Sequence, residues 1–108
     1  MTERIASELF ASIRNSAIPE LRDALFSYAV IYAHKRAEWR LADPERRREM
    51  DESRSRTHTV FIDCCNALSR AQVKIGESTE WRSRLGQDRK EIGDFACWIH
   101  AFLAIEAR

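Results

Sequence analysis

Residues that interrupt a helix are scarce in this chain. Its 108 residues include three glycines and two prolines, where average usage of about 7% glycine and 5% proline would supply roughly thirteen. A sandwich or barrel of short strands needs a turn about every eight to twelve residues. The scarcity therefore weighs against such β folds and favours a helical domain.

The few prolines and glycines also mark helix boundaries. Pro19 and Pro44 suit the first position of a helix, and Asp43 can cap the helix that starts at Pro44. Gly76 suits a helix end. With apolar residues at helical spacing, these signals predict a single all-α domain, residues 1–108, folded as an antiparallel bundle of four main helices at about 2–16, 19–42, 44–75 and 88–107, with a possible short helical turn at 80–85.

Residues 44–56 carry almost no apolar side chains, yet we expect them to be helical. Opposite charges four residues apart, such as Arg47 and Asp51, each stabilise a helix by ~0.2–0.5 kcal/mol. The helical spacing that defines the apolar stripe of the following residues also continues through this segment in the same register. The sequence thus favours one long helix over 44–75, frayed or kinked near 53–57, and leaves open a division into two.

Charge, hydropathy and cysteine content exclude several classes of protein. The 18 basic and 17 acidic residues give a net charge of +1 and are spread evenly, so no global field attracts nucleic acid or membranes. The longest apolar stretch is too short to span a bilayer, and the first ten residues do not resemble a secretory signal. Cys64, Cys65 and Cys97 show neither disulfide nor metal spacing. We expect a cytoplasmic protein with reduced thiols and no membrane partner.

A ligand-binding site is expected at one end of the bundle. If the second and third helices are antiparallel, Arg54 lies near Tyr32 and His58 near Tyr28, and the last helix returns Glu106 to the same level. A guanidinium and an imidazole beside phenolic hydroxyls can bind a small anion or a planar polar ligand. The structural alternative is that Glu106 neutralises Arg54 while the tyrosines cover the arginine stem.

Two carboxylates form a second candidate site. Glu91 and Asp94 share one helix face at i, i+3 spacing, where they can hold Mg²⁺ together with a substrate phosphate. The segment from Lys90 to Phe95 resembles the last conserved segment of the MazG-type nucleotide pyrophosphohydrolases. The resemblance covers a short stretch and implies an all-α enzyme that hydrolyses nucleoside triphosphates with Mg²⁺.

That family pairs this segment with a Glu-x-x-Glu on an earlier helix. Glu49 and Glu52 have the spacing, but an antiparallel bundle places them toward the opposite end from Glu91. The alternative for the two carboxylates is a set of weak surface ion pairs with Lys74 and Arg70. Outside the Mg²⁺ alternative we expect no cofactor.

Gly93 is the one glycine inside a predicted helix, between Glu91 and Asp94. A glycine there costs about 1 kcal/mol relative to alanine. Close helix packing or the approach of a ligand would explain it.

Histidines and cysteines give no catalytic pattern. No two of the three histidines stand at i, i+3 or i+4, so a Zn²⁺ site is not indicated. We expect His58 and His100 at buried edges and His34 in solvent. Cysteines in an apolar stripe have raised pKa values and are poor nucleophiles.

The sequence favours a non-enzymatic interaction or small-ligand-binding module. A homodimer is expected because helix 19–42 has two apolar faces and the last helix carries Trp98, Phe102 and Ile105 beyond a single stripe. The Mg²⁺-dependent MazG-type enzyme is the alternative. A further alternative is a nucleic-acid-associated regulatory protein that uses the arginines of 46–56 to contact phosphates. The competing interpretation of this segment is a solvated arm in which acidic neighbours form ion pairs with the arginines.

Overall fold

A computed structural model describes residues 1–108 and contains five helices and no strand. The all-α fold is confirmed, and each predicted boundary lies within two residues of the observed one. The short segment near 80–85 is a helix, and residues 44–75 form one uninterrupted helix. The bounds are Glu3–Arg14 for α1, Pro19–Leu41 for α2, Pro44–Ile75 for α3, Glu80–Leu85 for α4 and Arg89–Glu106 for α5.

Local chemistry explains where the helices begin and end. The side chain of Asp43 accepts a hydrogen bond from the amide of Arg46 at the start of α3, and Asp88 caps α5 in the same way. These carboxylates satisfy amides that have no partner inside the helix. At the end of α3, Gly76 adopts a φ of 79°, a left-handed conformation that glycine reaches without steric cost.

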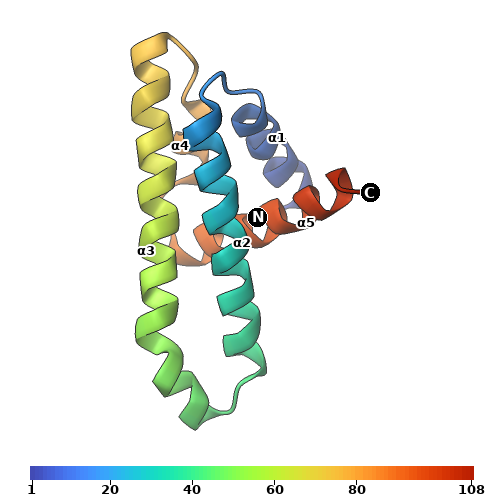
Figure 1. The fold of residues 1–108 in the computed structure, drawn as a ribbon, viewed down its shortest axis with the longest axis vertical. Helices are drawn as coiled ribbons and strands as arrows, with labels where there is room; N and C mark the ends of the chain where they lie inside the picture. Colours follow the sequence, from blue (N-terminus) through green and yellow to red (C-terminus); the bar gives the residue numbers. More distant parts are fainter.

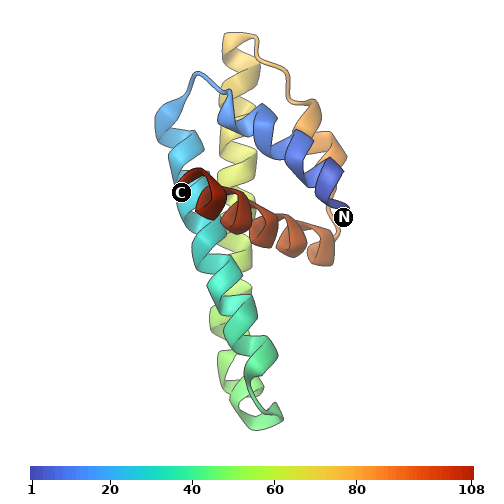
Figure 2. The ribbon, with the colours of Figure 1, turned by 90° about the vertical axis from the view of Figure 1, so that its right-hand side faces the viewer.

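The longest helices, α2 and α3, form an antiparallel hairpin, and α1 and α5 cross one side of it (Figures 1 and 2). The amino group of Met1 contacts Glu91 at the start of α5, while Arg14 contacts Glu106 at its end. Thus α1 and α5 run in the same direction, unlike helices of a simple up-and-down bundle. The cause is the connector containing α4, which returns the chain to the middle of α3 before α5 begins.

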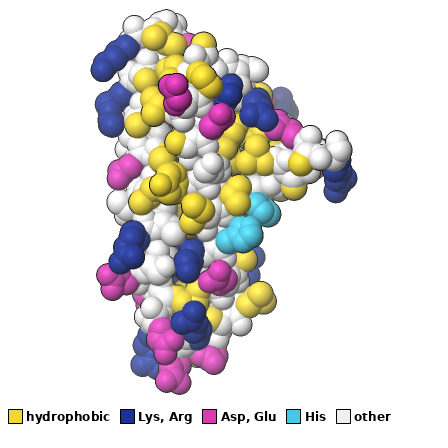
Figure 3. All heavy atoms as spheres, viewed as in Figure 1, with side chains coloured by type: hydrophobic (Ala, Val, Ile, Leu, Met, Phe, Trp, Pro, Cys, Tyr) yellow, Lys and Arg dark blue, Asp and Glu magenta, His cyan; other side chains and the backbone are white.

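The hydrophobic core lies where all five helices meet. The predicted apolar stripes supply most of it: Phe61 and Leu68 from α3, and Phe95 from α5, are fully buried. α4 adds Trp81 and Leu85. The lower half of the hairpin extends beyond this core and carries many charged side chains (Figure 3).

No helix has both the length and the apolar character that crossing a membrane requires.

Candidate functional site

A hydrogen-bonded tyrosine–histidine pair connects α2 with α3 at the edge of the core. The hydroxyl of Tyr32 lies 2.8 Å from Nδ1 of His58, and Tyr32 is 1% exposed. Burial raises the pKa of Tyr32. Burial also lowers the pKa of His58, and three nearby guanidiniums lower it further.

Because of these shifts, the imidazole is neutral and the phenol is protonated at pH 7. The Tyr32 hydroxyl therefore donates to Nδ1 of His58, and the imidazole proton resides on Nε2. The three cations around the pair are Arg36 on α2, Arg54 on α3 and Arg89 on α5.

Trp39 lies between two guanidiniums near the end of α2. The Cζ atoms of Arg47 and Arg54 are 4.4 and 4.2 Å from its ring centroid, a distance typical of cation–π contacts. Arg47 also donates from Nε to the carbonyl of Trp39 at 2.9 Å. The stacking holds Arg54 in place without neutralising it.

A small hollow opens beside these residues. It has a volume of about 60 Å³ and is lined by Arg36, Trp39, Arg40 and Arg54, and we call it the arginine hollow. Arg36 is paired with Asp94 at 3.1 Å. No carboxylate lies within ion-pair distance of Arg40 or Arg54, since neither takes part in any of the ten salt bridges. Uncompensated guanidiniums therefore line a concave surface.

The predicted ligand site is only partly assembled. Tyr32, His58 and Arg54 gather, although His58 pairs with Tyr32 rather than with Tyr28, which is 40% exposed. Glu106 is absent from the cluster because the C-terminal end of α5 points away from α3 (Figure 1), where this residue pairs with Arg14.

At the place predicted for Glu106 the structure has the start of α5. Nη2 of Arg89 donates to Oγ of Ser55 at 3.1 Å. A cation thus replaces the predicted carboxylate, which turns a neutralised cluster into a basic one. Arg36 and Arg40 were not among the predicted site residues, although their i, i+4 spacing around Trp39 places the two guanidiniums on one face of α2.

The two carboxylates of the Mg²⁺ alternative contact cations of this chain. Oε1 of Glu91 lies 3.1 Å from the amino group of Met1, and Asp94 contacts both Arg36 and Lys90. These partners differ from the predicted Lys74 and Arg70. The chain contains no group of three or more His, Cys, Asp or Glu residues that could hold a metal ion.

The Arg36–Asp94 pair explains the glycine inside α5. A Cβ built on Gly93 would lie 2.8 Å from Cζ of Arg36, so the guanidinium needs the space that glycine leaves. Burial opposes ionisation of Asp94, but hydrogen bonds from Lys90 and Arg36 outweigh it and lower its pKa. Close packing, one of the two predicted explanations for Gly93, is what the structure shows.

The remaining histidines lie apart from this cluster. His34 is exposed, as predicted, and packs edge-on against His100 with ring centroids 5.1 Å apart. His100 is exposed too, because it lies on the face of α5 that points to solvent. The prediction that it lies at a buried edge is therefore wrong. Burial raises the pKa of the Cys65 thiol to about 12, which keeps it protonated and unreactive.

Three of the five arginines of 46–56 form ion pairs or hydrogen bonds within the chain. Arg46 pairs with Glu49 and Arg56 with Glu52. Arg47 donates to two carbonyls at the end of α2. Arg48 and Arg54 form no ion pair, so the segment matches the ion-paired arm, the alternative to nucleic-acid binding, only in part.

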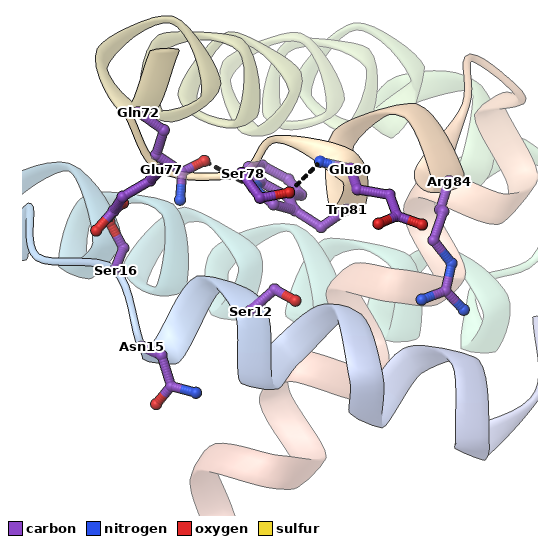
Figure 4. A pocket seen from close by; sticks show the side chains of 9 residues that line it. All are labelled: Ser12, Asn15, Ser16, Gln72, Glu77, Ser78, Glu80, Trp81 and Arg84. Atoms are coloured by element: carbon purple, nitrogen blue, oxygen red, sulfur yellow. Dashed lines mark hydrogen bonds between the residues drawn. The ribbon is translucent and has the colours of Figure 1, made fainter. Parts of the chain in front are cut away.

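A polar pocket of about 280 Å³ lies at the other end of the hairpin (Figure 4). Several of the residues that line it form hydrogen bonds that hold the fold together. The buried Gln72 accepts a hydrogen bond from Nε1 of Trp81 at 2.7 Å, and Glu77 accepts from the amide of Ala17 and the hydroxyl of Ser16. These bonds lower the pKa of Glu77 and join the α1–α2 loop to the α3–α4 loop.

Comparison with protein-family models, with curated proteins and with solved structures finds no match for this chain.

Proposed function

We propose that this protein is a non-enzymatic module that binds a small anion in the arginine hollow. The observation that carries the proposal is the pair of guanidiniums, from Arg40 and Arg54, that have no carboxylate partner in a concave site. Guanidiniums bind phosphate and carboxylate oxygens through paired, directional donors. The volume of the hollow equals roughly two water molecules, which suits a single anionic group.

The surroundings favour an anion over any other ligand. Arg89 adds a third cation without a carboxylate partner, and its guanidinium donates a hydrogen bond to the hydroxyl of Ser55. His58 stays neutral near these cations and can donate from Nε2. Two carboxylates contact the lining of the hollow: Asp94 pairs with Arg36, and Asp51 accepts a hydrogen bond from the indole of Trp39. Neither forms an ion pair with Arg40 or Arg54, so the local field stays positive. The catalytic alternative draws less support, because both of its carboxylates already contact cations.

Thermal unfolding tests the proposal. Phosphate should raise the melting temperature of the wild type above its value in chloride at matched ionic strength, since a ligand of the folded state stabilises it by mass action. Arg54→Gln should remove most of this gain. Arg46→Gln is the matched control, because Arg46 lies on the same helix outside the hollow and pairs with Glu49. Equal gains in all three proteins would reject the proposal.

We also propose that the protein forms a homodimer and is cytoplasmic. Exposed apolar side chains support self-association: Leu41 is 88% exposed and Ile105 57%. Trp98 and Phe102, by contrast, pack partly against the core. Light scattering at micromolar concentration tests the dimer, and a monomer would count against it. The three cysteines form no disulfide, which supports a location in a reducing compartment.

A further inference from the structure

A second hollow adjoins the arginine hollow and shares two residues with it. Its volume is about 350 Å³, which falls at the lower end of the range for small-molecule sites. Arg36 and Arg40 form the boundary between the two hollows. The rest of its lining comes from α5: Asp94, Cys97, Trp98 and Ala101. We call it the α5 hollow.

Trp98 gives the α5 hollow a flat, rigid wall. Its indole is stacked on Phe102, with ring centroids 5.8 Å apart and planes 20° from parallel, and it packs partly against the core. A side chain already fixed by such contacts loses little entropy when a ligand binds. An aromatic ring placed against it gains from offset stacking as well as from burial.

Because the two hollows share Arg36 and Arg40, they lie next to each other on the surface. Resting on the proposed function, we infer that the ligand is a small aromatic phosphate, with its phosphate in the arginine hollow and its ring against Trp98. Arg36 and Arg40, between the two parts, present guanidiniums that can contact oxygens at their edges and aromatic rings at their faces.

The charge count favours phosphate over carboxylate. Arg36 pairs with Asp94, which Lys90 also contacts, and the two guanidiniums without a carboxylate partner, Arg40 and Arg54, bring two positive charges to the arginine hollow. A phosphate monoester carries about −1.5 to −2 charges at pH 7 and neutralises both guanidiniums. A carboxylate carries a single charge and leaves one of them uncompensated.

Nuclear magnetic resonance of the three indole N–H groups tests the inference. Trp39 reports on the arginine hollow and Trp98 on the α5 hollow. Trp81, buried and bonded to Gln72, is an internal reference that should not move. The signals are assigned with single Trp→Phe variants, and the probes are phenyl phosphate, methyl phosphate, phenol and phenylacetate.

Phenyl phosphate should shift Trp39 and Trp98 together and bind about tenfold more tightly than methyl phosphate, which corresponds to about 1.4 kcal/mol. Methyl phosphate should move Trp39 alone, and phenol should move neither signal at the same concentration. Trp98→Leu should reduce the affinity for phenyl phosphate to that for methyl phosphate while leaving the latter unchanged.

The opposing outcomes separate the two proposals. Equal affinity for phenyl and methyl phosphate, with Trp98 unmoved, overturns the aromatic ligand and leaves the anion site in place. Phenylacetate binding as tightly as phenyl phosphate overturns the preference for phosphate. If no probe moves Trp39, the anion site itself is wrong.

Discussion

The guanidinium of Arg36 passes over Gly93 and donates from Nη1 to Oδ1 of Asp94 at 3.1 Å. This ion pair joins α2 of the hairpin to α5. Arg36 also lines both hollows. The space left by Gly93 therefore allows Arg36 both to pack against α5 and to line the candidate site.

Replacing Gly93 by alanine should gain less stability than helix propensity alone supplies. Alanine is favoured over glycine inside a helix by about 1 kcal/mol, but the added Cβ would displace the Arg36 guanidinium from Asp94. In an Arg36→Met background, where no guanidinium occupies the space, the same replacement should deliver the full gain. Urea unfolding of the four proteins measures the coupling. Identical effects in the two backgrounds would show that the contact is unimportant.

His58 should make the protein less stable in mild acid. Its pKa is lowered in the folded state, so the unfolded chain binds the proton more readily, and stability rises with pH across this range. The stability is present above the unfolded pKa of about 6.5 and is lost as the pH falls from there toward the folded pKa. His58→Gln should reduce the difference in urea midpoint between pH 7 and pH 5.5.

The control for that experiment is His34→Gln, because His34 is exposed and lies outside the cluster of Arg36, Arg54 and Arg89. It should retain the pH dependence of the wild type. A His58→Gln protein with an unchanged pH dependence would mean that His58 does not titrate as described.

Gln72→Leu should destabilise the fold because it leaves the indole N–H of Trp81 without an acceptor. Gln72 is 2% exposed and accepts the indole N–H of Trp81, and an unsatisfied buried donor costs about 1–3 kcal/mol. Gln87→Leu, on the exposed α4–α5 connector, should change stability by no more than about 0.5 kcal/mol. Equal urea midpoints for the two variants would argue that this hydrogen bond contributes nothing.

The helices were predictable because their boundaries depend on neighbouring residues. Pro19, Pro44 and Asp43 act locally, so no tertiary information is needed to place the starts of α2 and α3. The antiparallel pairing of these helices follows from the short turn between them. The number of residues from that turn predicts the candidate site to within about one helical turn, since His58 is hydrogen-bonded to Tyr32 instead of lying near Tyr28.

The composition of the site was less predictable because it depends on where α5 crosses the hairpin. The α4 connector sets that crossing, and it brought Arg89 where Glu106 was expected. Arg36 and Arg40 are not predictable as site residues, because charged residues on an amphipathic helix normally face solvent. Their spacing around Trp39, with a glycine in a facing helix, was the available signal.

The most direct test of the anion site is the affinity for inorganic phosphate, followed through the Trp39 indole signal at pH 7 in wild type and in Arg54→Gln. The wild type should show a saturable shift, and the variant should bind about tenfold more weakly, because a hydrogen bond to a charged group contributes about 1.5–3 kcal/mol. An unmoved Trp39 signal in the wild type, or equal affinity in the two proteins, would contradict the account.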